Sequence, residues 1–231
     1  MNVIVCLHAG AAGAPLGRAD RLALDQALSL AAREPGHQVT AVLVGTDTQT
    51  EALEGALAAG AHRAVRIDGE DVTNADFHSF GQIFAAAIKR LGADLVLAGM
   101  APDHGGLAAV PAAMARHLGF VHVSGIEAMA SAPSPGDGGS AIDVTVRGGG
   151  RKRRLRITLP AVLSVAGAAE GGSARVAGTG TGREVEVLSL VDPERTVVRR
   201  RAELNGKPEA GSRSPETVTS AAAFVAALYR K

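Results

Sequence analysis

The chain has 231 residues and a net charge of +1, so its length fits one large domain, with or without an extension, and its charge indicates neither nucleic acid nor a membrane surface as a partner. Hydrophobic residues make up 46%, which is enough for a sizeable core, whereas aromatic residues make up only 3% and argue against base stacking on aromatic rings. The single cysteine, Cys6, excludes a disulfide framework within the chain.

Strand and helix patterns alternate through the first half of the chain. Continuous apolar runs predict strands that are buried on both faces, and apolar residues at helical spacing predict helices between them. The expected strands are residues 3–7, 39–45, 63–68 and 95–99, and the expected helices are residues 18–34, 49–61, 76–93 and 106–119. Such alternation indicates right-handed crossovers, so the sequence predicts an α/β fold with a mostly parallel sheet and helices on both faces.

The pattern changes after residue 130. Residues 131–140 are rich in turn formers, and residues 141–165 hold strand-like runs around a Gly-Gly-Gly turn, which predicts an antiparallel hairpin added to the parallel core. Residues 185–190 are a candidate for one more strand. We therefore expect one α/β domain over residues 1–190, and a C-terminal arm that ends in an amphipathic helix over residues 191–231.

The N-terminal stretch lacks the features of a targeting signal. It has no basic region and only a short apolar run, and no window of the chain reaches the ~18 apolar residues that a membrane-spanning helix needs. We therefore expect no membrane insertion and a cytoplasmic location.

Glycine-bearing loops follow three of the expected strands. They begin at residues 7, 45 and 99, and the last of them, "GMAPDHGG", leads into the start of a helix. In an open parallel sheet, ligands bind beyond the carboxyl ends of the strands, and the N–H groups of a helix start suit a phosphate. These loops fit a nucleotide site, but they fit equally well the ordinary use of glycine to end strands, and the pattern leaves both open.

Motifs of several enzyme classes are missing from the sequence. There is no G-x-x-x-x-G-K-[ST], no G-x-G-x-x-G after the first strand and no G-x-S-x-G, which argues against an ATPase, a dehydrogenase and an esterase. The seven histidines show no metal-binding spacing. His8 and His104 both follow strand ends and can lie close together, but polar loop residues describe them better than catalytic bases do. We expect no metal site and no catalytic residues, hence not an enzyme in its own right.

The stretch "RKRRLR" at residues 151–156 is strongly basic. As a strand it places Arg151, Arg153 and Leu155 on one face and Lys152, Arg154 and Arg156 on the other. A charged hairpin in solvent is the favoured interpretation, because the chain as a whole is nearly neutral. Docking to an acidic protein surface is the alternative, and nucleic acid is disfavoured without interleaved aromatic residues.

Several segments together resemble the beta subunit of electron transfer flavoproteins, over nearly the full length of the chain. The similar stretches are "MNVIVCLH" at the start, "ALDQALSLA" at 23–31, "VTAVLVG" at 39–45, "EALEGALAAGAHRAVRI" at 51–67, "ADLVLAG" at 93–99, "AMARHLG" at 113–119 and "LPAVLSV" at 159–165. The resemblance implies a Rossmann-like α/β subunit that pairs with an alpha subunit. It also implies an FAD held mainly by the alpha subunit, an AMP or second FAD in the beta subunit, and a dehydrogenase as electron donor.

The resemblance also implies a set of nucleotide-binding positions, in the loops after the first, second and fourth strands and at the start of the first helix. The cofactor-binding residues expected from it are Cys6, His8, Asp20, Val44, Gly99, Met100, Asp103, His104, Gly105, Gly106, Leu107 and Val110.

The chain departs from the family pattern at several of these positions. The family loop reads roughly G-x-Q-A-I-D-x-D-T-x-Q-V-G, whereas this chain has "GMAPDHGGLAAVP" at 99–111. His8 stands where a lysine is common, "GRAD" at 17–20 replaces N-P-x-x, and "GGSARVAGTGTGRE" replaces the recognition arm N-E-P-R-Y-P with its lysine-rich continuation. The resemblance therefore covers the scaffold better than the side chains that would meet the nucleotide and the dehydrogenase.

Three functions follow from these observations. The leading hypothesis is a beta-type subunit of an electron transfer flavoprotein. The alternative is a diverged stand-alone protein that binds an adenine nucleotide without a redox role. The third is a structural subunit whose nucleotide site no longer binds a ligand.

Overall fold

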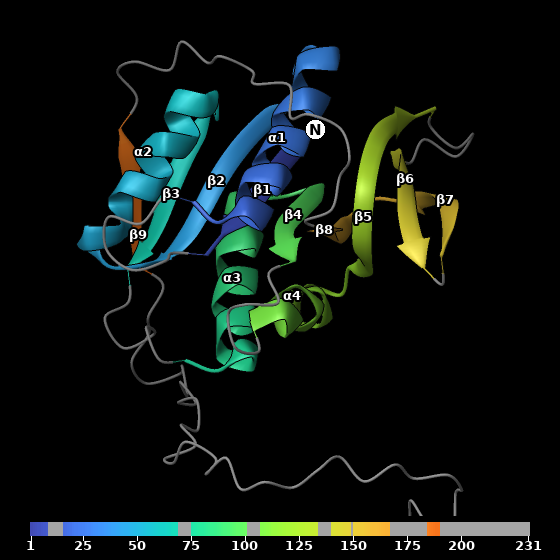
Figure 1. Ribbon diagram of the computed structural model, residues 1–231. Helices are drawn as coiled ribbons and strands as arrows, with labels where there is room; N and C mark the ends of the chain where they lie inside the picture. Colours follow the sequence, from blue (N-terminus) through green and yellow to red (C-terminus); the bar gives the residue numbers. More distant parts are fainter. Residues whose placement is uncertain are drawn as a thin grey trace, which may run out of the picture. The chain divides into compact units, whose positions relative to one another are not determined.

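A nine-stranded sheet runs through the part of the chain that the structure describes, in the order β7-β6-β5-β8-β4-β1-β2-β3-β9 (Figure 1). The computed structural model describes residues 1–8, 16–68, 75–100, 107–133, 140–148, 150–166 and 184–189, which all belong to one compact unit. The strands are β1 (Asn2–Leu7), β2 (Gln38–Gly45), β3 (Arg63–Asp68), β4 (Leu95–Met100), β5 (Val121–Ala132), β6 (Ala141–Gly148), β7 (Arg151–Thr158), β8 (Ala161–Ala166) and β9 (Val185–Ser189).

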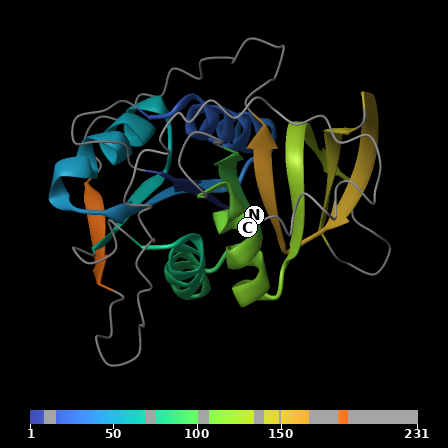
Figure 2. The ribbon, with the colours of Figure 1, turned by 60° about the horizontal axis from the view of Figure 1, so that its bottom comes forward.

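Helices cover both faces of this sheet. The α-helices are α1 (Arg18–Arg33), α2 (Thr50–Ala59), α3 (Phe77–Leu91) and α4 (Val110–Leu118), with short 3-10 helices η1 (Asp47–Gln49) and η3 (Leu107–Ala109). Figure 2 shows the two blue helices, α1 and α2, on one side of the sheet and the two green helices, α3 and α4, on the other. The predicted α/β fold, with a mostly parallel sheet between two helical layers, is therefore confirmed.

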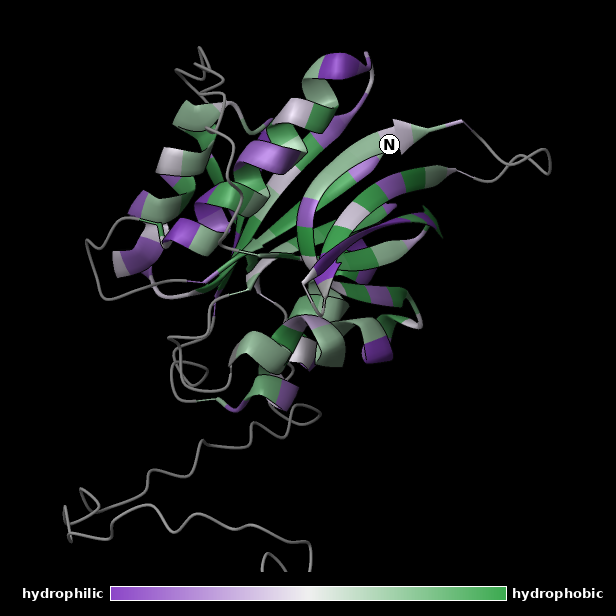
Figure 3. Cartoon of the chain, turned by 45° about the vertical axis from the view of Figure 1, so that its right-hand side comes forward, coloured by the Kyte–Doolittle hydropathy of each residue, from purple (hydrophilic) through white to green (hydrophobic). Residues whose placement is uncertain are grey.

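Alternating strand residues feed two separate apolar clusters. In β1, Val3, Val5 and Leu7 pack with α1 and α2, while Ile4 and Cys6 pack with α3 and α4. Because both faces of the central strands are covered, these strands are apolar throughout, as the continuous runs in the sequence predicted. Figure 3 shows this as hydrophobic colour along the central strands and hydrophilic colour on parts of the helices.

Small residues bring the helices close to one another and to the sheet. Ala23 and Ala27 of α1 are fully buried against the strands. Gly81 of α3 lies against α4, where a Cβ atom would approach the Cβ of Ala113 to 2.6 Å. The chain therefore builds its core from close backbone approach, in keeping with its low content of aromatic residues.

Strand β5 was not anticipated from the sequence. It pairs in parallel with β8 along its first half and antiparallel with β6 along its second, with a bulge between Ile126 and Ala128. Only Ile126 and Met129 of its twelve residues are buried, so it lacks the apolar run that marks the other strands. The pairing with β8 shifts register between Ser124 and Ile126, where Gly125 has a φ of +75°.

The predicted hairpin is confirmed over β6 and β7, but it does not extend to residue 165. Residues 161–166 form β8 instead, which lies parallel between β4 and β5 in the middle of the sheet. The burial of this strand explains its central place, since four of its apolar residues are fully buried: Ala161, Val162, Leu163 and Val165. The second half of the chain therefore supplies a central parallel strand, β8, as well as the antiparallel hairpin.

The candidate strand at residues 185–190 is confirmed as β9, which pairs in parallel with β3 at one edge of the sheet. The C-terminal arm, its terminal helix over 217–231 and the boundary after residue 190 lie outside the described residues. They stay predictions.

Candidate functional site at the carboxyl edge of the sheet

The strand order reverses between β1 and β4. From β1 the chain proceeds through β2 to β3 on one side, whereas β4 and then β8 lie on the other. All of these strands run parallel, so their carboxyl ends share one edge. Open α/β sheets bind ligands at this kind of switch point. His8, directly after β1, and Gly99, near the end of β4, lie on either side of it.

The first turn of α1 approaches β4 closely at Gly99. A Cβ atom on Gly99 would lie 2.6 Å from the carbonyl carbon of Ala19, 2.7 Å from the backbone nitrogen of Asp20 and 2.5 Å from its Oδ1. Separations under about 3 Å do not occur for real Cβ atoms, so only glycine allows this approach. The contact holds the start of α1 over the switch point.

His8 and Asp20 form a buried pair at the same place. The backbone N–H of His8 donates to Oδ2 of Asp20 at 2.9 Å, and His8 Nδ1 lies 3.3 Å from Oδ1. Their side chains are 6% and 3% exposed. His8 Nε2 is buried and has no hydrogen-bond partner among the described residues, while the ring edge faces Phe84 with centroids 6.3 Å apart. The pair therefore carries a polar atom that no described residue satisfies, at the edge of the sheet where a ligand would bind.

Cys6 lies in β1, close to His8 in the sequence. Its Sγ contacts the Sδ of Met114 in α4 at 3.8 Å, and the residue is fully buried. Burial, and next the nearby Asp20 carboxylate, raise the pKa of the Cys6 thiol far above its usual range. The thiol stays protonated at neutral pH, so Cys6 is a packing residue rather than a nucleophile or a thiolate ligand.

The remaining expected site residues lie around this centre at different depths. Val44 in β2 and Val110 at the start of α4 are buried in the same apolar cluster as Cys6, and Met100 at the end of β4 is half-buried. Leu107 begins η3. Asp103, His104, Gly105 and Gly106 lie outside the described residues, so their expected contacts stay predictions, as does the expected proximity of His8 and His104.

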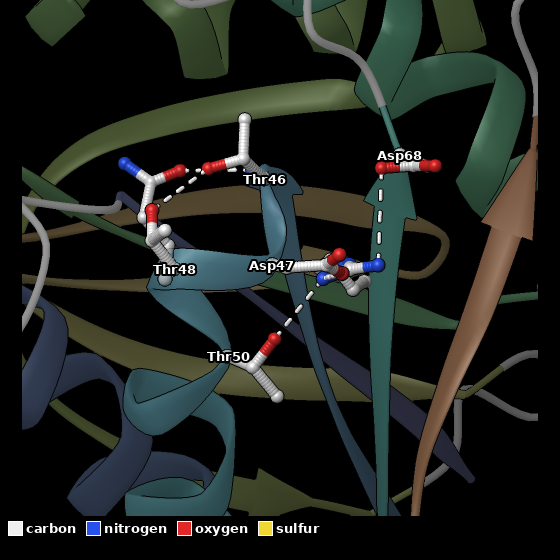
Figure 4. Close-up of polar contacts among 7 residues, drawn as sticks. Thr46, Asp47, Thr48, Thr50 and Asp68 are labelled. Atoms are coloured by element: carbon white, nitrogen blue, oxygen red, sulfur yellow. Dashed lines mark hydrogen bonds and ion pairs between the residues drawn. The ribbon is translucent and has the colours of Figure 1, made fainter.

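A second polar cluster, not anticipated from the sequence, joins the end of β3 to the start of α2. The side chain of Arg66 is 7% exposed, and its guanidinium contacts Asp47, the Thr50 hydroxyl at 3.1 Å and Asp68 at 3.8 Å (Figure 4). Arginine is rarely buried without such partners. Its two Nη atoms contact Asp47, Thr50 and Asp68, so Arg66 ties strand to helix, while its buried Nε has no hydrogen-bond partner among the described residues. The available signal was a charged residue between the apolar residues of a short strand.

The loop between β2 and α2 is closed by its own side chains. Gln49 Oε1 accepts from the backbone N–H of Thr46 at 3.0 Å, which forms a capping box, and the hydroxyls of Thr46 and Thr48 lie 3.0 Å apart (Figure 4). A Cβ on Gly45 would lie 2.2 Å from Gln49 Oε1. This loop is folded against itself at the end of β2.

Comparison with known proteins identifies the family. Residues 6–193 match the family described as the electron transfer flavoprotein domain. That match covers most of the chain. The chain belongs to the electron transfer flavoprotein beta-subunit family.

Individual beta subunits of electron transfer flavoproteins show the same relationship. That of Syntrophomonas wolfei is 32% identical over 145 residues, which is 63% of this chain and 54% of the relative. That of Mycobacterium bovis is 30% identical over 160 residues, 67% of this chain and 58% of the relative, and that of Clostridium acetobutylicum is 36% identical over 108 residues. The chain thus spans little more than half the length of the first of these relatives.

Two further properties bear on the candidate site. Among the described residues, no group of three or more histidine, cysteine, aspartate or glutamate side chains is placed to hold a metal ion. No helix in the described part of the chain is long and apolar enough to cross a membrane.

Proposed function

We propose that the chain is the beta-type subunit of an electron transfer flavoprotein, which pairs with an alpha subunit and carries electrons from a dehydrogenase through FAD. The observation that carries the proposal is the family match over residues 6–193. The alpha subunit holds most of the FAD in this proposal, and the complex works in the cytoplasm.

An adenine nucleotide, AMP or a second flavin, binds in this proposal at the carboxyl edge between β1 and β4. The described residues fit such a group in two ways. Gly99 and the first turn of α1 bring backbone close to the switch point, and His8 Nε2 is a buried polar atom without a partner among them. Cys6 and Val44 are buried, so they line the site from below and leave backbone atoms for contact.

The chain itself contributes positioning rather than chemistry. When bound, the flavin supplies the electron-transfer chemistry, since a cofactor carries the redox step and the protein orients it. The residues of this chain bind the nucleotide, and the apolar cluster below it excludes water. The Cys6 thiol, protonated and buried against Met114, takes no part in electron transfer.

Purification of the complex from its native source tests the proposal. We expect a tagged full-length chain to bring down an alpha-type subunit together with a flavin absorption spectrum, and mass spectrometry of the released small molecules to find an adenine nucleotide. Nucleotide without an alpha subunit or flavin would favour the stand-alone binding protein. Absence of partner, flavin and nucleotide alike would contradict the proposal and favour a structural subunit.

A further inference from the structure

Among the described residues, the buried Nε2 atom of His8 has no hydrogen-bond partner, which indicates that it bonds a ligand. The imidazole is buried between the first turn of α1 and α3, and Nε2 has no partner in the part of the chain that the structure describes. Native proteins leave few buried polar atoms unsatisfied, and the exceptions require a reason such as a ligand or a catalytic role. At the switch point of a parallel sheet, the natural partner is a bound molecule.

Asp20 determines which hydrogen-bonding role this nitrogen has. A carboxylate only accepts hydrogen bonds, so the ring nitrogen beside it, Nδ1, carries a proton, and in the neutral imidazole Nε2 then presents its lone pair. The geometry therefore favours Nε2 as an acceptor, and its ligand as a hydrogen-bond donor.

The charge of Asp20 restricts the ligand group further. A phosphate near the first turn of α1 would gain from the helix dipole, but here it would meet the Asp20 carboxylate in that same turn. A hydroxyl group has no such conflict and donates to Nε2. In dinucleotide-binding α/β folds, an acidic side chain accepts from a ribose hydroxyl. Here the acidic residue acts through the imidazole that it orients.

We propose that His8, oriented by Asp20, accepts a hydrogen bond from a ribose hydroxyl of the bound nucleotide. The inference rests on the proposed function, because it names the contact made by the nucleotide assigned to this site. His8 is the binding residue, and Asp20 is a positioning residue that acts through it.

Calorimetric titration of the purified full-length chain tests the contact, with AMP, 2′-deoxy-AMP and 3′-deoxy-AMP as ligands. We expect the wild type to bind AMP at least ~10-fold more tightly than one of the deoxy analogues, since a site built to bond a hydroxyl rejects the analogue that lacks it. His8→Phe should lose this preference. His8→Gln, whose side-chain oxygen can accept a hydrogen bond, should keep part of it.

His122→Gln is the matched control. His122 lies near the start of β5, at the amino ends of the parallel strands, where its Nε2 already bonds the Ser164 hydroxyl at 3.0 Å. This variant should keep the wild-type preference. Long-range ¹H–¹⁵N NMR of the free protein reports the His8 tautomer independently. We expect the proton on Nδ1 in the wild type and a changed tautomer in Asp20→Asn.

The possible results separate the inference from the function on which it rests. If the wild type binds no adenine nucleotide, the nucleotide part of the proposed function fails and the inference fails with it. If the wild type binds AMP but His8→Phe keeps the hydroxyl preference, the inference alone is wrong. Purine riboside monophosphate lacks the 6-amino group of the base. If His8→Phe loses the preference for AMP over this analogue instead of the hydroxyl preference, His8 contacts the base and the ribose assignment is wrong. If His8→Phe fails to fold, the hydroxyl preference of His8→Gln and the NMR tautomer of His8 test the inference in its place.

Discussion

At the scale of single residues, the carboxyl edge depends on Gly99 and the His8–Asp20 pair. Gly99 has no side chain, and this lets the first turn of α1 lie against β4. That approach brings the Asp20 carboxylate within hydrogen-bond distance of the His8 backbone N–H. One absent Cβ atom therefore positions the charged group that orients the histidine.

Replacement of Gly99 by alanine tests this dependence. The new Cβ would meet the backbone of Ala19 and Asp20, which cannot move as a flexible side chain does, so we expect a loss of ~1–3 kcal/mol in the free energy of unfolding. Gly55→Ala is the control, because Gly55 lies exposed in α2 with no atom near its Cβ position. It should stabilise the protein by ~0.5–1 kcal/mol. Urea unfolding measures both, and equal effects of the two changes would contradict the close approach.

A pH effect is expected from His117 in α4. Burial, followed by the charges of His78, Lys89 and Arg116, lowers the pKa of His117 below its usual value of about 6.5. The folded state therefore binds fewer protons than the unfolded state. Stability should fall as the pH drops from about 6.5 to the lower pKa of the folded state, and it should be fully present above that interval.

Urea unfolding at pH 7.5 and 5.5 measures this effect. His117→Gln should lose less stability than the wild type on acidification. Gly55→Ala changes no titratable group, leaves the His78–His117 pair, with ring centroids 4.9 Å apart, intact and should keep the wild-type loss. An unchanged loss in His117→Gln would show that the pair does not contribute.

At the scale of elements, helix ends and strand order explain how the site is framed. Helix α3 is capped at its N-terminus by Asp76, whose side chain accepts from the backbone N–H of Ser79 at 2.8 Å. This helix supplies Phe84 beside His8, and it packs on α4 through Gly81. The start of α3 thus matters to the layer that supports the switch point.

Removal of this cap gives a prediction for the element. Asp76→Ala should lower the free energy of unfolding by about 1 kcal/mol, because the N–H of Ser79 loses its partner. Asp76→Ser should restore most of the loss, since serine caps helices in the same way. Thermal or urea unfolding compares the three proteins, and equal stability of Asp76→Ala and wild type would contradict the role of the cap.

At the scale of the whole sheet, the two edges are protected in different ways. Strand β9 is short, whereas β7 is an edge strand rich in arginine. On one face of the hairpin, Arg156 bonds Asp143 through both side-chain oxygens, while Arg147 and Lys152 approach Glu127. This supports the interpretation of the basic stretch as a charged, solvated hairpin. Charged side chains on an edge strand hinder pairing with a second sheet.

Loss of that charge should promote self-association. The double variant Arg151→Thr/Arg153→Thr replaces the two arginines on either side of Lys152 with threonine, which favours β structure. The edge strand then stays exposed but carries less charge. We expect sedimentation velocity to show dimers or larger species. Arg21→Gln/Arg33→Gln removes the same charge from α1 and should stay in the wild-type state of association. Identical behaviour of the two double variants would contradict the role of the edge.

Most of the scaffold was predictable because its signals are local. Apolar runs predicted β1 to β4, and glycine marked the ends of helices and strands. Strand β5 was missed, since it is half exposed and its pairing partners come later in the chain. Arg66 was missed because a charged residue in a strand acquires meaning only from Asp47 and Thr50 beside it.

The sequence by itself determined the α/β class, the alternation of its elements and the family, because these depend on residue periodicity and on similarity along the chain. Only the tertiary structure placed β8 between β4 and β5, brought Asp20 to His8 and left Nε2 without a partner among the described residues. The physical reason is that strand order and buried polar contacts join residues that lie far apart in the sequence. Close backbone approach at Gly99 and burial of the Arg66 side chain are decided by those contacts and by no local pattern.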